Sequence, residues 1–167
     1  MQTTRSASSD RVETIVVNTG PLIALARIGA LTMIGELPYD FLCPAEVRAE
    51  LDVGVALGHP GVEPPWLYVC PALRLSPLAC FALDSGEAAV IQLALDRGIA
   101  RVCIDEWKGR KAALAVGLKV FGVLGLLGRA KAIGLTRAVR PWIEKALQEG
   151  IRYHPALVQK VLEEAGE

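Results

Sequence analysis

The fold of this chain is decided by the stretch Arg101-Val102-Cys103-Ile104-Asp105-Glu106, in which a short apolar run ends directly at two carboxylates. Helical patterns flank the run on both sides, and such a run is typical of a parallel strand that is buried on both faces. An earlier run, Ile15-Val16-Val17, ends in the same way at the polar residue Asn18. Because ligands bind outside the carboxyl ends of the strands in open parallel sheets, Asn18 and Asp105 are expected to share one pocket. An acidic pocket of this kind suggests a divalent metal ion.

The rest of the chain alternates between short strand-like runs and longer helical ones. The predicted strands span residues 14–17, 41–42, 66–69, 101–104 and 119–121. The predicted helices span residues 21–28, 84–97, 106–116, 123–133, 136–148 and 155–164, with one more that begins at Pro44 and a loop over 54–65. Alternating strands and helices predict an α/β fold with a mostly parallel central sheet.

Composition and length favour one globular domain. We interpret residues 1–12 as a flexible, polar N-terminal tail and expect residues 13–167 to form a single domain with one core. A hydrophobic content of 52% argues against disorder. No apolar run reaches the roughly 18 residues of a membrane-spanning helix, and the polar start lacks the apolar centre of a signal peptide. We therefore expect a soluble, cytoplasmic protein with no membrane partner.

The four cysteines, Cys43, Cys70, Cys80 and Cys103, are scattered without the paired spacing of a metal site. We expect buried free thiols, because free cysteine packs as a small hydrophobic side chain. The two histidines each lie beside a proline, and nothing in the sequence pairs them with another ligand. A zinc site or a cysteine–histidine catalytic pair is therefore not expected.

Charge is distributed unevenly along the chain, although the net charge is zero. Residues 101–140 contain nine basic residues and two acidic ones, whereas residues 36–97 contain nine acids and three bases. A basic rim beside an acidic pocket suits a phosphate backbone that approaches metal ions. The alternative is that these charges lie on solvated helix faces.

Each candidate site residue also has a structural interpretation. Glu87 lies three residues after Asp84, which is the spacing of a helix capping box, and this role competes with metal ligation. Asp105 is placed either to bind a metal at a strand end or to cap the following helix, since aspartate is a favoured cap. Asn18 is placed either in the site or as the cap of the helix near Pro21. The sequence leaves these alternatives open.

The helix that begins at Pro44 carries two acids, Glu46 and Glu50, which lie four residues apart on one face. Acids on a helix surface are solvated by default. Either residue is a candidate for the acid that this helix contributes to a site, and the sequence does not decide between them.

Four stretches of the chain form an ordered set of motifs. They are Val16-Val17-Asn18-Thr19-Gly20-Pro21-Leu22-Ile23-Ala24-Leu25, Cys43-Pro44-Ala45-Glu46-Val47-Arg48-Ala49-Glu50-Leu51, Leu83-Asp84-Ser85-Gly86-Glu87-Ala88, and Ile104-Asp105-Glu106 with Gly109-Arg110. In this order they resemble PIN-domain proteins, most closely the little-characterised prokaryotic subgroup related to VapC-type toxins. Residues 117–125 match the next strand and helix of that subgroup, and the resemblance runs from about Thr14 to Leu162.

The resemblance implies a three-layer α/β/α PIN-like fold and RNA cleavage that depends on Mg²⁺ or Mn²⁺. The acids of the family lie at the carboxyl ends of the strands. Asn18 falls on the first family aspartate, and Glu50 falls on the helix glutamate. Glu87 falls on the acid that opens the middle helix, and Asp105 on the acid after the fourth motif's strand. Glu106 stands where the subgroup often has a second aspartate.

The chemistry suits these residue types. Magnesium prefers hard oxygen ligands and keeps several waters, so a few carboxylates suffice. A bound metal lowers the pKa of a water molecule and shields charge on a phosphate. The basic residues Lys108, Arg110 and Lys111 are candidates for contacts to the RNA backbone.

Asn18 supplies an amide where the family has a carboxylate, so the site has one negative charge fewer. One charge pair at about 4 Å contributes up to about 4 kcal/mol before desolvation, at an effective dielectric near 20. Two hypotheses follow. The first is a metal-dependent endoribonuclease that uses Asn18 as a neutral ligand, the toxin of a toxin–antitoxin pair, with RNA, a small antitoxin and a second copy of the chain as partners. The alternative is a PIN fold that has lost catalysis and binds RNA or a protein partner.

Overall fold

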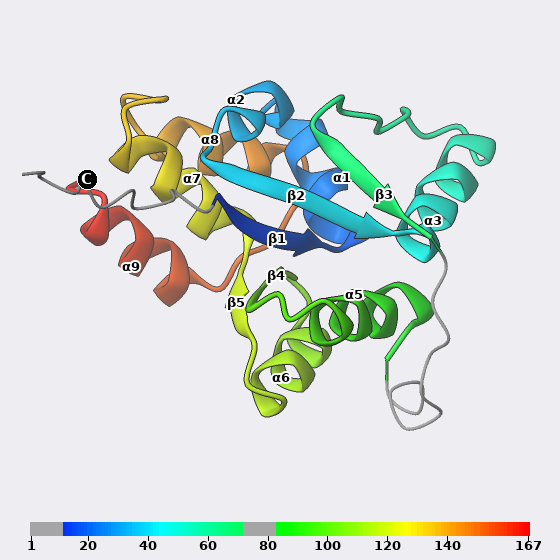
Figure 1. Cartoon of the computed structure of the whole chain (residues 1–167). Helices are drawn as coiled ribbons and strands as arrows, with labels where there is room; N and C mark the ends of the chain where they lie inside the picture. The colour runs from blue at the N-terminus through cyan, green and yellow to red at the C-terminus, as the bar shows by residue number, and fades with distance from the viewer. Residues whose placement is uncertain (1–11, 72–82) are drawn as a thin grey trace, which may run out of the picture.

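The protein is organised around a five-stranded sheet, and the computed structural model describes residues 12–71 and 83–167 (Figure 1). The strands are β1 (Glu13–Val17), β2 (Tyr39–Pro44), β3 (Leu67–Cys70), β4 (Arg101–Cys103) and β5 (Lys119–Phe121). They follow the order β3-β2-β1-β4-β5, and every pair of neighbours is parallel. The predicted α/β class with a parallel central sheet is confirmed.

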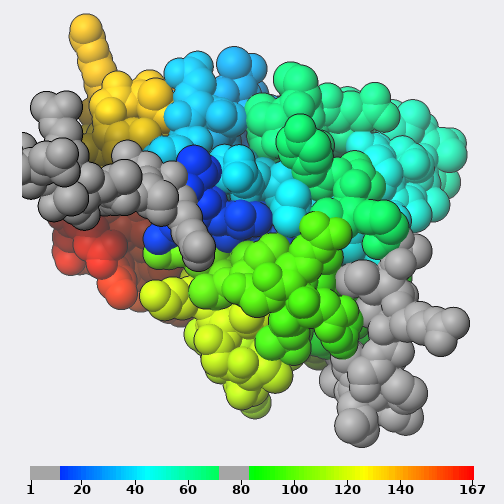
Figure 2. All heavy atoms as spheres, in the orientation of Figure 1, coloured from blue at the N-terminus to red at the C-terminus, as the bar shows by residue number. Residues whose placement is uncertain are grey.

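Helices cover both faces of the sheet. They are α1 (Thr19–Ile28), α2 (Leu31–Gly35), α3 (Ala45–Ala56), α5 (Ser85–Asp96), α6 (Trp107–Ala115), α7 (Val123–Ala132), α8 (Arg140–Gln148) and α9 (Pro155–Glu164). In Figure 1, α5 and α6 lie below the sheet, and α1, α2, α7 and α8 lie above it. Figure 2 shows the green atoms of the α5 region packed against the blue and cyan atoms of β1 and β2. The arrangement has the three α/β/α layers that the resemblance implies.

The direction in which the chain crosses the sheet reverses between β1 and β4. From β1 the chain proceeds outward to β2 and β3, and it then returns to the other side of β1 to form β4 and β5. Val17 pairs with Cys103, and the Asn18 N–H donates to the Cys103 carbonyl at 3.0 Å. Such a switch point leaves a crevice at the carboxyl edge of the sheet. Asn18 and Asp105 therefore leave neighbouring strands at the same edge.

The two central strands are buried on both faces, as their apolar runs predict. The residues that carry these runs are at most 1% exposed, namely Ile15, Val16, Val17, Val102, Cys103 and Ile104. Full burial of one large aliphatic side chain contributes about 1.5–3 kcal/mol. The core is therefore concentrated beneath the strand ends that carry the candidate site, and it holds their backbone in place.

The largest differences from the predicted helices concern α3, α8 and α2. Helix α3 continues to Ala56, into the predicted loop, because the first residue that helical geometry excludes is Gly58, with a φ of 90°. Helix α8 begins at Arg140 instead of Thr136, since Pro141 suits a first turn and the Thr136 hydroxyl donates to the Ala138 carbonyl at 3.1 Å. Helix α2 was not predicted, because five residues are too few to show a helical period.

Two expectations from composition can be compared with the structure. Cys43, Cys70 and Cys103 are buried free thiols, as predicted, whereas Cys80 lies outside the described residues. Within residues 12–71 and 83–167, no helix has both the length and the apolar character needed to cross a membrane.

The packing of Trp66 gives a test of the core. Its indole donates to the Leu31 carbonyl at 3.0 Å and lies 4.9 Å from the Phe41 ring, between centroids. A Cβ atom at Gly35 would lie 2.8 Å from Cγ of this fixed ring. We predict that Gly35→Ala lowers the free energy of unfolding by about 1–3 kcal/mol in urea denaturation. Gly128→Ala is the control, because its Cβ meets no atom within 4 Å, and it should be neutral or stabilising by up to about 1 kcal/mol. Equal effects of the two substitutions would contradict this packing.

Candidate functional site

Asn18 follows β1 and occupies the position before the first residue of α1. Its backbone has the extended conformation of a helix cap, yet its side chain makes no capping hydrogen bond. The side chain is buried, and its Oδ1 atom has no hydrogen-bond partner among the described residues. Asn18 therefore occupies the cap position of α1, as one of the two alternatives predicted, but its side chain does not cap the helix. A buried amide oxygen without a donor has capacity for a ligand, since leaving it unpaired costs free energy.

Glu50 connects two segments that are far apart in the sequence. Its Oε1 accepts the Gly86 N–H at 3.0 Å, and its Oε2 accepts a short hydrogen bond from the Thr19 hydroxyl. A Cβ atom at Gly86 would collide with this carboxylate. Thr19 follows Asn18, and Gly86 precedes Glu87, so one side chain of α3 ties together the backbone on which both candidate residues lie. Glu50 therefore lies between α1 and α5 with both carboxylate oxygens hydrogen-bonded, and it is not a fully solvated acid on the surface of α3.

Glu87 takes part in the capping box that its spacing predicts. The Glu87 N–H donates to Asp84 Oδ1 at 2.7 Å, and the Asp84 backbone also hydrogen-bonds to the Glu87 carboxyl group. The Glu87 side chain is only 2% exposed, and its Oε1 has no partner among the described residues. A Cβ atom at Gly109 would lie 3.0 Å from this oxygen. Capping therefore leaves one Glu87 oxygen free, so the box does not exclude a second role.

The environment of Glu87 favours its protonated form. The pKa of this carboxyl is raised to about 7, chiefly by burial and also by the nearby Asp84 and Glu106 carboxylates. Glu106 also hydrogen-bonds to Glu87 through its side chain. The two acids are thus brought together, and near neutral pH Glu87 is partly protonated, with a proton that a bound cation would displace.

Asp105 is held from two directions. Its Oδ1 accepts the Val123 N–H, the first of α7, at 3.0 Å, and a Cβ atom at Gly122 would lie 2.6 Å from the same oxygen. The prediction that Asp105 caps the helix after it is wrong, because it caps α7 instead of α6. Burial raises the pKa of Asp105, opposed by the Val123 hydrogen bond and by the charge of Arg110. Arg110 is itself oriented by donating to the Ile104 carbonyl at 2.7 Å.

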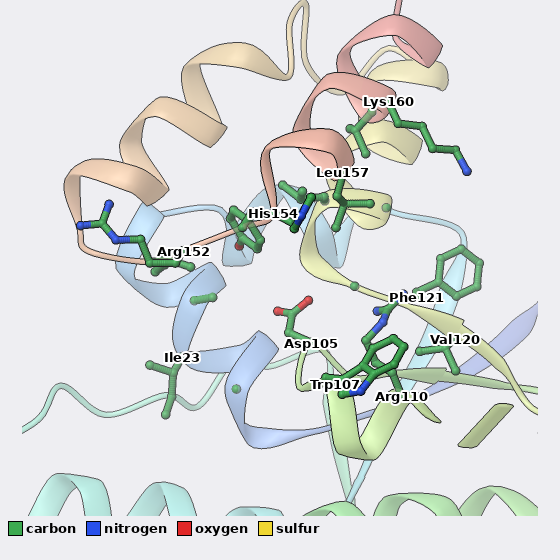
Figure 3. Close-up of a pocket in the computed structure, with 18 of the residues that line it drawn as sticks. Ile23, Asp105, Trp107, Arg110, Val120, Phe121, Arg152, His154, Leu157 and Lys160 are labelled. Atoms are coloured by element: carbon green, nitrogen blue, oxygen red, sulfur yellow. The ribbon is translucent and has the colours of Figure 1, made fainter. Parts of the chain in front are cut away.

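A cleft of about 870 Å³ opens beside Asp105 (Figure 3). Asp105 and Arg110 line it from the sheet edge and α6, and the segment from Ile151 into α9 lines it from the opposite side. Of the three basic residues predicted to contact RNA, only Arg110 lines this cleft. Lys108 and Lys111 are exposed on α6. Their predicted contacts to RNA remain predictions.

The oxygen donors at this edge can be compared with the needs of a divalent cation. In the described ranges, no three histidine, cysteine, aspartate or glutamate side chains lie close enough to hold an ion by themselves. The unpaired oxygens of Asn18 and Glu87 are nevertheless the hard ligands that Mg²⁺ and Mn²⁺ prefer. Magnesium keeps several waters and needs only one or two carboxylates. The residues therefore fit a hydrated divalent ion, and they do not fit a closed carboxylate cage.

Several residues of this site had no assigned role in the sequence. Thr19 and Gly86 donate to Glu50, Gly109 and Gly122 leave room for carboxylates, and Tyr153 contributes a buried hydroxyl. Gly86 and Gly109 stand inside the quoted motifs, and Gly122 lies in the matching stretch 117–125. This position in the motifs was the only local signal of a role. The contacts themselves join residues 31 and 36 positions apart, which no local pattern shows.

The parallel sheet, with acids at its carboxyl edge beside a cleft, defines a nuclease-type α/β domain. The chain matches the family model DUF3368, a PIN domain, over residues 14–167, and it belongs to this family. PIN domains are generally nucleases that act on RNA and typically use divalent metal ions. No curated protein and no solved structure matches the chain. The predicted membership of the PIN-domain family is confirmed.

The proton on Glu87 predicts how stability depends on pH. The ordinary pKa of a glutamate is 4.5, so between that pH and about 7 the folded chain binds more protons here than the unfolded chain. Stability should therefore fall as the pH rises from about 5 to above 7. Glu87→Gln removes this fall, and in urea denaturation with EDTA it should be more stable than the parent by about 1–3 kcal/mol at pH 8 and not at pH 5. The same effect at both pH values would show that Glu87 ionises normally.

Proposed function

We propose that the chain is a metal-dependent endoribonuclease whose centre lies at the carboxyl edge of β1 and β4. The observation that carries the proposal is the pair of buried, unpaired oxygens of Asn18 and Glu87 at this edge of a PIN domain. In this proposal Asp105, Glu87 and Asn18 are the catalytic residues. Glu87 and Asn18 would hold Mg²⁺ or Mn²⁺ through their unpaired oxygens, and the other candidate ligands, Asp105, Glu50 and Glu106, would contact the ion through its bound waters.

The contacts of each side chain at this edge indicate its role in the proposed reaction. Glu87 would lose its proton and offer Oε1, while Glu50 keeps Asn18 and Glu87 in register through Thr19 and Gly86. Asp105 is fixed by the start of α7 and lines the cleft. A divalent ion bound among these oxygens would activate a water molecule and offset the charge of a phosphate.

Arg110 is the proposed contact for the scissile phosphate. One of its N–H groups donates to the Ile104 carbonyl, which fixes the guanidinium at the cleft beside Asp105. Its fork of five donors leaves other N–H groups for phosphate oxygens. Lys108 and Lys111, which are exposed on the same helix, would add electrostatic attraction to the backbone on either side.

Cleavage of RNA tests the proposal directly. We predict that the purified protein cleaves a labelled single-stranded RNA in Mn²⁺ and that EDTA abolishes the reaction. Asp105→Asn keeps the acceptor for Val123 but removes one charge, so the rate should fall about 10²-fold or more. Asp96→Asn is the matched control, because Asp96 is an exposed acid at the end of α5 whose only bonded partner among the described residues is Gln92, and its activity should be unchanged. Cleavage that persists in EDTA would contradict the proposal.

The amide at Asn18 predicts a measurable deficit in metal affinity. Asn18→Asp would restore the carboxylate of the family, and part of the roughly 4 kcal/mol gross attraction of one charge pair should survive desolvation. We expect Mn²⁺ to bind this variant at least about tenfold more tightly in calorimetry, and to raise its melting temperature more than that of the parent. Without metal the variant should be less stable, since it buries an unpaired charge. Unchanged Mn²⁺ affinity would remove Asn18 from the proposed ligand set.

A second candidate function follows from the same amide. A site with one acid fewer suits a PIN fold that binds RNA or a protein partner without cleaving it. The signature of that function is salt-sensitive RNA binding that needs no divalent metal and leaves the RNA intact. Cleavage assays and binding assays on the same RNA separate the two functions.

The resemblance to VapC-type toxins extends the proposal to partners. In this extension the chain is the toxin of a pair, acts as a homodimer and is held inactive by a small antitoxin in the cytoplasm. Suppression of its ribonuclease activity by the product of an adjacent gene, together with co-elution of the two proteins, is the expected result. Independent elution with full activity would remove the toxin role and leave the nuclease proposal intact.

A further inference from the structure

The cleft beside Asp105 has a second wall that the proposed chemistry does not use. The segment from Ile151 to His154 and the first turns of α9 face Trp107 and Arg110 across the cleft, and Asp105 points between them (Figure 3). The volume of about 870 Å³ lies in the range of sites for small ligands, and it exceeds what a single phosphate group needs. The cleft therefore has room for a larger group next to the catalytic edge.

Trp107 is exposed at the mouth of this cleft. It is the first residue of α6 and is 73% exposed, although it lines the cleft. The other two tryptophans are partly buried, and each has a partner for its indole N–H: Trp66 donates to the Leu31 carbonyl, and Trp142 donates to the Thr136 hydroxyl. Packing within the chain thus accounts for Trp66 and Trp142 but not for Trp107. An exposed aromatic ring in a basic groove is the feature on which nucleic-acid bases stack.

The charges of the cleft favour an anionic ligand. Its lining contains four cationic side chains and two acids, which are Arg27, Arg110, Arg152, Lys160, Asp105 and Glu164. Neither Arg27 nor Arg152 forms an ion pair or side-chain hydrogen bond with another described residue. Lys160 is 3.8 Å from Glu164 in an exposed pair, which contributes little and leaves the ammonium group accessible. In Figure 3, Arg152 and Lys160 lie on different sides of Asp105, where they could contact phosphates on either side of one nucleotide.

Tyr153 adds a polar group to the inner part of the cleft. Its hydroxyl is buried and has no hydrogen-bond partner among the described residues, although Tyr153 lines the cleft. A phenol donates one hydrogen bond, and a buried donor without an acceptor is costly. The hydroxyl is covered in this structure, so a ligand oxygen in the cleft would satisfy it only after the covering groups move.

We infer that this cleft binds one unpaired nucleotide next to the cleavage site, with its base stacked on Trp107 and its flanking phosphates on Arg27, Arg152 and Lys160. The inference rests on the proposed RNA cleavage and names the part of the RNA that the chain recognises. The nucleotide must be unpaired, because a base within a duplex already stacks on both faces and cannot offer one to the indole. Stacking accepts every base, so the site selects single strands more than sequence.

Binding without cleavage tests this inference separately from the nuclease activity. In EDTA and low salt, the parent should bind a fluorescent single-stranded RNA more tightly than the matching duplex, and the RNA should quench tryptophan fluorescence. Trp107→Ala should weaken binding about five- to 150-fold, whereas Trp107→Phe should retain most of the affinity but lose the quenching. Leu114→Ala is the control, because Leu114 is 57% exposed on the same helix and lies outside the cleft lining, and it should change nothing.

The outcomes distinguish the two proposals. If RNA is bound through Trp107 but never cleaved in Mn²⁺, the nuclease proposal fails, and the nucleotide site at Trp107 stands without a cleavage site beside it. If RNA is cleaved and Trp107→Ala binds single strands as the parent does, the inference is overturned and the nuclease proposal stands. An abasic RNA bound as tightly as the intact one would also overturn it. So would a glutamate-rich peptide that occupies the cleft in preference to RNA.

Discussion

The carboxylate of Glu50 is the interaction on which the arrangement of the site depends. It accepts the Thr19 hydroxyl and the Gly86 N–H, and so joins α3 to the first turns of α1 and α5. Both oxygens of this partly buried side chain accept a hydrogen bond, and these contacts offset its loss of hydration. The two donors are the chain neighbours of Asn18 and Glu87. The hydrogen bonds to Glu50 therefore also hold the backbone that carries both unpaired oxygens at the edge of the sheet. Gly86 must lack a side chain because a Cβ atom there would displace this carboxylate.

The other acids of this edge combine a structural role with a free oxygen or an open side. Glu87 completes the capping box of α5 with Asp84 and keeps Oε1 unpaired, and Asp105 caps α7 while it lines the cleft. In the sequence, the spacing of Asp84 and Glu87 presented helix capping and ligand binding as alternatives. In the structure, the capping contact of Glu87 leaves one of its oxygens free for a ligand. Burial raises the pKa of both Glu87 and Asp105, so in the absence of a cation the edge favours the protonated forms of these acids.

Local patterns in the sequence predict most of the fold and the position of the site, but not its connections. The apolar runs at Val16 and Val102 identify the central strands, because full burial on both faces leaves a continuous apolar run. The placement of Asn18 and Asp105 at one edge follows from parallel topology alone. The role of Glu50 and the cleft wall that includes Tyr153 depend on contacts between distant segments, and periodicity holds no information about these. The Asn18 side chain makes no capping hydrogen bond, and the Asp105 side chain caps α7. Both results depend on side-chain orientation, which composition and spacing do not predict.

In the proposed function, a divalent cation binds among the oxygens at the carboxyl edge of β1 and β4. Anomalous diffraction from crystals of the protein grown in Mn²⁺ measures this directly, because only the metal scatters anomalously with strength at its absorption edge. If the cation binds there, the anomalous map should contain one strong peak in contact with Glu87 and with Asn18 or Asp105. Peaks confined to acids elsewhere on the surface, or no peak at saturating Mn²⁺, would contradict it.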